Sequence, residues 1–487
     1  KMKKLAAILV ICVMLLTPFS AAMAMDYGDY LNSMLEFMQD MYYQDMNDEE
    51  ALMAALKGMF KGLDPYSDFY DNQETQRFNE NLEGTFSGIG VAIEQCPEGV
   101  LVVKVYEESP AEKAGLWEGD IILAVDSVPT AGKDTETVAS EIKGPEGTTV
   151  TLTIQRQSEK MDIAIKRGIV VISPVTWRKE GDIAYICIES FNSNTGKKFG
   201  EVMDEIGRLG ITKILLDLRN NPGGYVDEAV DVARRLVPRG LITRLDFKSE
   251  RLGDQDYYSY LANSPYLVAV LVNGNRASAA EILAGAIQDS GKGVLVGQNT
   301  FGKGVVQNMF AVLTPEAYAK YSKQYGIGYV TEIEWLVYHG VFLSPNDILG
   351  TIKITTGHYL TRNGRQIHGV GLAPDVEVED RTLANGIDLV QVSRLANSET
   401  LTVNDYGIDV YQAERILKAA GYFEGIPDRK LDEETQAAVK KFQSDKKIRV
   451  TGNIDTATRD KLNELLDELR KQYDPQYVKG MEILRMF

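Results

Sequence analysis

Between residues 168 and 398, short apolar runs alternate with patterns typical of amphipathic helices, and this alternation restricts the fold more than any other feature of the sequence. The apolar runs occupy residues 183–188, 213–218, 267–272 and 293–297. They are separated by helical patterns at residues 200–209, 227–236 and 279–288. Strands that alternate with helices form largely parallel sheets with crossover helices. We therefore expect an α/β core, with a ligand site beyond the carboxyl ends of its strands.

The segments on either side of this core differ from it in pattern. The stretch before the core is first helical and then rich in short β runs separated by turn signals. The stretch after it repeats a helix start, with Asp432 and Asp455 each three residues before a threonine. A chain of 487 residues is too long for one core. We predict an α/β multidomain protein with these segments: 1–24, 25–83, 84–168, 169–398 with an insert at 312–350, 399–472, and a tail at 473–487.

The first 24 residues have the pattern of a secretory signal peptide. Lys1, Lys3 and Lys4 precede an apolar run at 5–16, and two small residues, Ala22 and Ala24, follow it. The apolar run is too short to span a bilayer comfortably. A buried N-terminal helix is the alternative interpretation. We expect an exported protein whose signal is either removed or kept as a membrane anchor.

Charge and cysteine content narrow the possible partners and the source of stability. Lysine and arginine number 52 against 70 acidic residues, a formal net charge of −18. This balance argues against nucleic acid and against anionic membrane surfaces as partners. Beyond the signal-like segment only Cys96 and Cys187 remain, too few for a disulfide framework. Packed cores must therefore supply the stability.

Ser278 is the first candidate for chemistry. It follows the apolar run at 267–272 and directly precedes the helical pattern that starts at Ala279. Its hydroxyl would lie at the carboxyl edge of the sheet, and the free N–H groups at the start of the helix could stabilise an oxyanion. Serine is also a favoured N-cap residue, so a purely structural cap is the alternative.

A serine nucleophile needs a base, and the sequence favours a lysine for that task. The chain has three histidines, none in an obvious catalytic setting: His339, His358 and His368. Lys303 lies between Gly302 and Gly304, which let the backbone approach other elements closely. Lysine can act as a base if burial lowers its pKa from about 10.4 towards about 7–8. Gln307, four residues further on, could orient the ammonium group.

The segment around Lys303 has a second interpretation. Gly297, Gly302 and Lys303 fit the spacing of a nucleotide-binding P-loop. That loop needs serine or threonine after the lysine to ligate magnesium, and this chain has Gly304. An exported protein also meets little ATP, so the P-loop is disfavoured.

A third element is the turn Gly223–Gly224, which follows the apolar run at 213–218. Such a turn could present a backbone N–H to an oxyanion. On spacing alone, an ordinary loop between a strand and a helix is as good an interpretation.

Together these elements resemble the signature motifs of the bacterial C-terminal processing peptidases. The matching segments are Asp217-Leu-Arg-Asn-Asn-Pro-Gly-Gly224, Asn273-Gly…Ser278-Ala-Ala-Glu281 and Phe301-Gly-Lys303-Gly…Gln307, in the order typical of that family. The resemblance implies an α/β serine protease core with a serine–lysine dyad, and no metal or organic cofactor.

The same resemblance implies a role for each matching residue. Ser278 would be the nucleophile, Lys303 the general base, and Gln307 the partner that orients the lysine. The backbone N–H groups of Ala279 and of the turn formed by Gly223 and Gly224 would form the oxyanion hole.

The β-rich segment 84–168 resembles a PDZ domain. Its carboxylate-binding loop would be formed by Gly88, Ile89, Gly90 and Val91. The glycines free backbone N–H groups for a terminal carboxylate, and the adjacent strand edge can pair with an extended peptide. A module that only spaces the helices from the core is the alternative. Lys143 stands where related enzymes often carry arginine; lysine keeps the positive charge but lacks the planar fork of that arginine.

The sequence also makes predictions for the insert at 312–350 and for the segment 399–472. In the insert, Thr314 and Pro315 start a helix that Gly326 can end, and residues 329–338 are rich in β-formers and predict a strand. The insert would form a lid over the site or a packed β-extension of the core. Residues 399–472 resemble peptidoglycan-binding modules, with a plain helical appendage as the alternative. We expect the part beyond about residue 397 to localise the enzyme without contributing to catalysis.

These observations predict an exported serine endopeptidase that selects protein or peptide substrates through their free C-termini. Peptidoglycan is the expected second partner, in or near the cell envelope, and the helical segment 25–83 makes a homodimer a reasonable expectation. The rival hypothesis is a catalytically inactive cell-wall scaffold that binds C-termini and peptidoglycan.

Overall fold

The computed structural model describes residues 27–96, 98–106, 108–156, 159–275, 277–395 and 399–486. The signal-like segment 1–24 lies outside the described residues. The chain divides into one unit up to Phe69 and a second from Tyr70 onwards, and β1 (Asp68–Tyr70) lies at their boundary. No helix in the described ranges is long and apolar enough to cross a membrane.

The first unit contains α2 (Tyr27–Met41) and α3 (Asp48–Lys61). α3 begins at the N-cap Asn47, whose side chain accepts the N–H groups of Glu49 and Glu50. The second unit opens with α4 (Asn72–Glu83), which starts in a capping box formed by Asp71 and Glu74. The helical pattern predicted before residue 84 is therefore confirmed.

A small β-rich module follows α4. Five antiparallel strands form its main sheet, in the order β3 (Val91–Cys96), β4 (Gly99–Val105), β5 (Ile121–Val125), β7 (Thr149–Arg156) and β8 (Glu159–Lys166). The shorter elements are β2 (Thr85–Gly88), β6 (Val128–Pro129), β9 (Gly168–Val171), α5 (Pro110–Lys113) and α6 (Thr135–Ile142). β2 pairs with β9, which brings the two ends of the module together.

The predicted parallel sheet is the centre of the second unit. Its strands, in spatial order, are β10 (Val175–Glu180), β11 (Ile183–Ile188), β12 (Lys213–Asp217), β15 (Leu267–Val272), β16 (Gly293–Gly297) and β19 (Val376–Glu377). Only β10 is antiparallel to its neighbour within this sheet. The prediction of a largely parallel sheet with crossover helices is confirmed.

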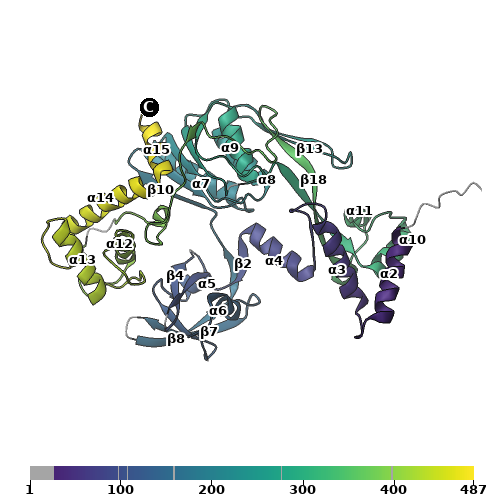
Figure 1. Ribbon diagram of the computed structural model, residues 1–487, viewed down its shortest axis with the longest axis horizontal. Coiled ribbons are helices and arrows are strands. Elements are labelled where there is room, and N and C mark those ends of the chain that lie inside the picture. The colour runs from purple at the N-terminus through teal and green to yellow at the C-terminus, as the bar shows by residue number, and fades with distance from the viewer. Residues whose placement is uncertain are drawn as a thin grey trace, which may run out of the picture. The chain divides into compact units, whose positions relative to one another are not determined.

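Different helices cover the two faces of this sheet. One face packs against α7 (Thr195–Arg208), α8 (Val226–Leu236) and α9 (Ala279–Asp289) in the largest apolar core of the chain. The other face packs against α15 (Pro475–Arg485), which follows all of the other elements in the chain. Figure 1 shows α15 in yellow next to the strands of the core. The segment 473–487, predicted only as a tail, therefore contains α15, and this helix supplies one layer of the core.

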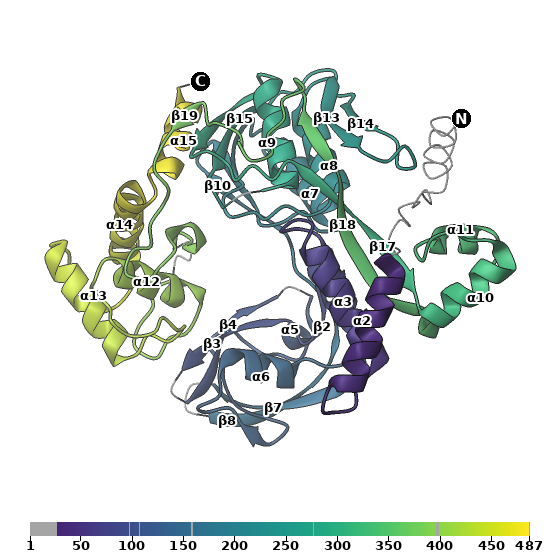
Figure 2. The ribbon, with the colours of Figure 1, turned by 45° about the vertical axis from the view of Figure 1, so that its right-hand side comes forward.

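A second sheet extends from the core and carries the insert. It includes β13 (Gly240–Phe247), β14 (Gln255–Ser259), β17 (Val305–Leu313) and β18 (Ile348–Thr361). The insert folds at the outer end of the β17–β18 pair as α10 (Pro315–Tyr325), α11 (Ile333–Tyr338) and η1 (Pro345–Asp347) (Figure 2). Thr314 caps α10 and Gly326 ends it, as predicted.

The strand predicted at residues 329–338 is wrong, because most of that segment is the helix α11. Leu336 is fully buried in a small cluster with Leu313, Ala317 and Tyr321, and Ile333 packs against the same cluster from one turn earlier. Packing of two residues three positions apart favours a helix. β-propensity depends on context, and here the local apolar cluster decides the outcome.

The C-terminal module has three helices around its own core. They are α12 (Ile408–Ala419), α13 (Glu433–Asp445) and α14 (Thr456–Tyr473), and η2 (Leu389–Gln391) precedes them. Asp432 and Asp455 are the N-caps of α13 and α14, and each accepts the N–H of the threonine three residues later. The predicted repeat of helix starts is confirmed.

Candidate active site

Ser278 lies on a strained turn between β15 and α9. Its backbone has φ 61° and ψ −124°, a region that residues with a β-carbon rarely adopt unless their surroundings hold them there. The side chain is half-buried, and Ala279 directly after it is the first residue of the helix. A serine on a sharp turn from a strand into a helix presents its hydroxyl at the edge of the sheet, which is the local geometry of a nucleophile elbow.

A buried carboxylate holds this turn against the Lys303 segment. One oxygen of Glu281 accepts the backbone N–H groups of both Ser278 and Lys303, each at 2.9 Å. Its other oxygen accepts the Gly302 N–H at 2.9 Å and the hydroxyl of Thr300. Glu281 is completely buried, so these hydrogen bonds replace the water that the carboxylate loses. Ser278 and Lys303 are thereby adjacent in space.

Tyr359 adds a second bridge between the same two segments. Its hydroxyl, on β18, lies 2.6 Å from the carbonyl oxygen of Lys303 and 3.0 Å from that of Ser278. The side chain is 1% exposed. A hydroxyl has one proton and donates to one of these carbonyls at a time. Its position between them fixes the spacing of the two backbones.

The glycines beside Lys303 allow another close approach. A β-carbon at Gly302 would lie 2.6 Å from the backbone nitrogen of Gly371, and one at Gly304 would lie 2.6 Å from that of His368. Neither position has room for a side chain. The Lys303 side chain itself is half-buried.

The turn after β12 lies directly against Ser278. A β-carbon at Gly223, which has φ 100°, would lie 2.7 Å from the β-carbon of Ser278 and 3.1 Å from the nitrogen of Ala279. The Gly223 N–H donates to the side-chain oxygen of Asn221 at 2.8 Å. The structure therefore brings Ser278, Ala279 and the glycine turn together, while their roles stay predictions.

Gly224 is held by an isolated parallel bridge to Phe191. The Phe191 N–H donates to the Gly223 carbonyl at 2.9 Å, and the Tyr225 N–H donates to the Phe191 carbonyl at 2.7 Å. In this pattern the N–H of Gly224 points away from Phe191.

Gln307 lies on β17, next to a bulge in the pairing with β18. Its side-chain amide donates to the hydroxyl of Thr355 at 3.2 Å. The predicted role in orienting Lys303 stays a prediction.

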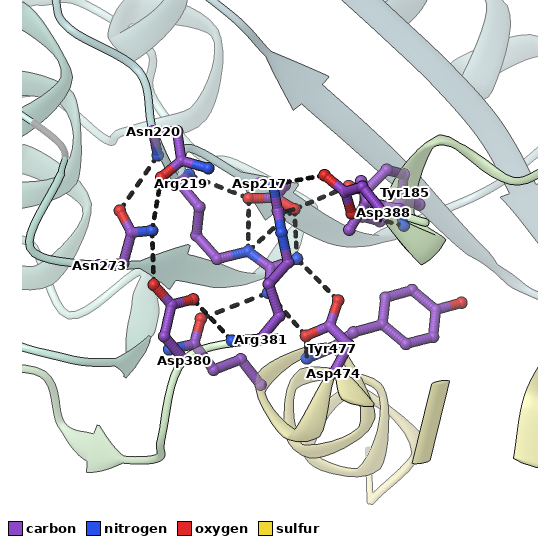
Figure 3. A network of polar contacts seen from close by, with 12 residues as sticks. Tyr185, Asp217, Arg219, Asn220, Asn273, Asp380, Arg381, Asp388, Asp474 and Tyr477 are labelled. Carbon is purple, nitrogen blue, oxygen red and sulfur yellow. Dashed lines mark hydrogen bonds and ion pairs between the residues drawn. The ribbon is translucent and has the colours of Figure 1, made fainter. Parts of the chain in front are cut away.

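Beyond these residues, the loop after β12 carries an ion-pair network that the sequence did not reveal (Figure 3). Arg219 donates to both oxygens of Asp217 and to both oxygens of Asp474, which precedes α15. The Tyr185 hydroxyl donates to Asp217 at 2.7 Å. Asp217 and Arg219 stand in the recognised motif, but Asp474 lies at the far end of the chain. In the sequence, Asp474 stands before Pro475 as an ordinary helix N-cap would, and nothing nearby indicates its ion pair with Arg219.

Electrostatics keep Asp217 and Arg219 ionised. Burial by itself would raise the pKa of the Asp217 carboxyl, but the Arg219 charge and its hydrogen bonds outweigh burial and hold that pKa below its usual value. Burial and the nearby Asp217 charge raise the pKa of the Tyr185 hydroxyl well above its usual value, so it stays a donor.

The predicted peptide-binding loop lies between β2 and β3. Gly88 ends β2, Ile89 is 1% exposed within the module core, and Val91 begins β3. Gly90 has φ 88°, and a β-carbon there would lie 2.4 Å from that of Ser109. β3 is at one end of its sheet, so its outer edge can pair with an extended peptide.

Lys143, the residue that replaces the more usual arginine, lies near this loop. Its ammonium nitrogen is 5.5 Å from the centre of the Phe86 ring on β2. Within the described ranges, no group of three or more His, Cys, Asp or Glu side chains is arranged to hold a metal ion.

Family profiles match three parts of the chain. Residues 182–378 match peptidase family S41, residues 101–156 match the PDZ domain, and residues 406–462 match a peptidoglycan binding domain. The first match includes both Ser278 and Lys303.

Full-length relatives agree with these matches. A Staphylococcus aureus protein named "Probable CtpA-like serine protease" is 30% identical over 458 residues, which cover 93% of this chain and 84% of the relative. A protein of the same name from Staphylococcus epidermidis is 32% identical over 436 residues, covering 89% and 81%. A solved structure titled "Photosystem II D1 C-terminal processing protease" is 26% identical, covers 70% of this chain and 85% of its own, and has a TM-score of 0.38.

Fold, domain content and relatives define a multidomain α/β serine protease. The chain belongs to peptidase family S41, among the CtpA-like serine proteases.

Proposed function

We propose that this protein is an exported endopeptidase in which Ser278 is the nucleophile and Lys303 the general base. One observation carries the proposal: the strained turn of Ser278 and the backbone of Lys303 share a single oxygen of the buried Glu281. A structure that maintains a strained serine and fixes a lysine segment beside it favours function at that point over a simple helix cap.

The reaction follows from these positions. Neutral Lys303 accepts the proton of the Ser278 hydroxyl as the serine oxygen bonds to the scissile carbonyl carbon. The N–H of Ala279, at the free start of α9, and the N–H of Gly224 are the proposed donors to the oxyanion. The Gly223 N–H already donates to the side chain of Asn221, so Gly224 is the proposed donor from the turn. Lys303 then returns the proton to the leaving amine, and water hydrolyses the acyl-enzyme.

Substitutions in the dyad test this assignment. Ser278→Ala and Lys303→Ala should each nearly abolish turnover of a peptide substrate, and the double variant should be little worse, because the two residues act as a unit. Lys303→Arg should also fail, since guanidinium does not give up its proton in this range. In the wild type, kcat/KM should rise with pH through the apparent pKa of the lysine. Full activity in Lys303→Arg would refute the assignment.

We also propose that the PDZ domain selects substrates through their C-terminal carboxylate. The free edge of β3 and the loop from Gly88 to Val91 support this, because strand addition beside a cluster of N–H groups is how such domains hold a chain end. A test protein with an amidated C-terminus should be cleaved much more slowly than the same protein with a free acid. Equal rates would exclude selection by the carboxylate.

The peptidoglycan binding domain and the signal-like segment 1–24 together support a place in the cell envelope. We propose that the C-terminal module holds the enzyme on peptidoglycan, and that the helices before residue 84 form a homodimer contact. Pull-down on isolated sacculi and analytical ultracentrifugation measure these two properties separately.

A further inference from the structure

The last helix of the chain packs directly against the central sheet. Tyr477, Met481 and Leu484 of α15 are buried against Leu215 of β12 and Leu271 of β15. A β-carbon at Gly480 would lie 2.5 Å from the Leu215 side chain. α15 thus lies directly beneath the two strands whose ends carry the glycine turn and Ser278.

Asp474 connects this helix to the catalytic loop. Its carboxylate receives Arg219 through two hydrogen bonds, at 2.6 and 3.0 Å, and also accepts the Tyr477 N–H at 3.0 Å as the cap of α15. The side chains of Arg219 and Asp474 are 0% and 4% exposed. Figure 3 shows the guanidinium between the two carboxylates of Asp217 and Asp474. Planar bidentate pairs of this kind fix orientation as well as charge.

Arg219 in turn begins the loop that ends in the glycine turn. Its neighbour Asn220 has φ 59° and is held through its N–H and side chain by Asn273, on the segment that leads to Ser278. The Asn221 carbonyl accepts the Ala277 N–H at 3.2 Å. The position of the Arg219 side chain therefore influences the position of this loop relative to Ser278.

We propose that Asp474 is a positioning residue for the catalytic loop, so that α15 completes the active site from the side opposite the substrate. This rests on the proposed function, since the loop is assigned to the oxyanion hole there. Asp474 touches neither substrate nor reacting atoms. It acts through Arg219. Without the Asp474 carboxylate, Nε and Nη2 of Arg219 would still donate to Asp217, but Nη1 would keep only the side-chain oxygen of Gln476, 3.4 Å away.

The test is Asp474→Asn, which removes the charge and keeps a good N-cap. Misplacement of catalytic groups by about 1 Å can cost about 100-fold in rate. We expect kcat to fall by about 10- to 100-fold, with KM within about twofold, and the affinity for a peptide aldehyde that forms a tetrahedral adduct to fall in parallel with kcat. Unchanged kcat would overturn the proposal.

Two controls separate positioning from stability. Asp455→Asn makes the same change at the cap of α14, and Met481→Ala loosens α15 without touching Arg219. Both should keep wild-type kcat in the folded fraction, whatever their melting temperature. A kcat loss in Met481→Ala equal to that in Asp474→Asn would show a general packing effect and sink the positioning role.

The remaining outcomes are also decisive. If Asp474→Asn does not fold, Asp474→Glu keeps the charge but shifts it by one methylene, and should lower kcat without raising KM; wild-type kcat in that folded variant would contradict the proposal. Turnover that survives Ser278→Ala would overturn the proposed dyad. The comparison of kcat in Asp474→Asn with wild-type kcat would still test the positioning role by itself.

Discussion

At the scale of single residues, the candidate site depends on backbone positions that cannot accept a side chain. Gly223 combines φ 100° with a contact that would place a new β-carbon 2.7 Å from that of Ser278. Gly364, in a turn on the same unit, also has positive φ, at 75°, but has nothing within 4 Å of a new β-carbon. The two glycines therefore separate the cost of the backbone conformation from the cost of the close approach.

Gly223→Ala should abolish most activity, whereas Gly364→Ala should cost only stability. The left-handed conformation costs roughly 1–2 kcal/mol for a residue with a β-carbon, and both variants incur it. Only the first pushes the turn away from Ser278. Steady-state kinetics and thermal unfolding of both variants measure the difference. Similar kcat values in the two would show that contact between the turn and Ser278 is dispensable.

The sequence predicted Ser278, Lys303 and the glycine turn but gave no role to Glu281 or Tyr359. Glu281 stands three residues after Ser278, the spacing of a capping box, and that signal could have located its bond to the Ser278 N–H. Its hydrogen bonds to the segment around Lys303 join two loops, and no local sequence pattern encodes such contacts. The Tyr359 hydroxyl lies between the backbone carbonyls of Ser278 and Lys303, which are distant from it in the sequence. No sequence pattern predicts these contacts either.

At the scale of elements, the predictions were correct where nearby residues determine the helix or strand. The caps at Asp432, Asp455 and Thr314 start helices because their side chains satisfy N–H groups three residues on. The alternation of apolar runs and helical patterns gave the parallel sheet. The strand prediction for residues 329–338 was wrong because packing in a small apolar cluster, and not the β-propensity of these residues, determined their structure.

The C-terminal module contains a buried acid with a consequence for its pH dependence. Glu414 on α12 is 1% exposed; it accepts the Asp428 N–H at 2.6 Å and the Thr435 hydroxyl. Burial, and then the charge of Asp428, raise the pKa of the Glu414 carboxyl well above its usual value. Because the folded pKa exceeds the unfolded one, stability is greatest below the unfolded pKa and declines as pH rises through the folded pKa.

Glu414→Gln should therefore raise the unfolding temperature of the module at pH 8 and give little gain at pH 4. Glutamine can still accept the Asp428 N–H, and its amide can donate to Thr435. Calorimetry on the full chain at the two pH values measures the change, with the exposed Glu433→Gln as the matched control. A larger gain at pH 4 than at pH 8 would contradict this prediction.

At the scale of the whole molecule, the structure changes the expectation that the part beyond residue 397 only localises the enzyme. Burial of Tyr477, Met481 and Leu484 contributes roughly 1.5–3 kcal/mol each, against about 5–15 kcal/mol for a typical domain. The sequence could not show this, because α15 has an ordinary helical pattern and its partners on β12 and β15 lie about 200 residues or more earlier.

A chain that ends at Tyr473 should lose proteolysis and keep retention on sacculi. It lacks α15 but retains the three helices of the module and their own core. Peptide cleavage and sacculus pull-down of the same preparation measure both properties. Normal cleavage by this shortened chain would show that the core sheet does not need its second layer.

The position of α15 along the chain also has a consequence for timing. Every other element of the catalytic core is synthesised before it, and until it emerges, one face of the central sheet is open and Arg219 lacks one of its two carboxylates. A nascent chain would then carry the serine and the lysine before the loop beside them is fixed. The loop beside Ser278 would therefore reach its final position only when synthesis of the core elements is finished.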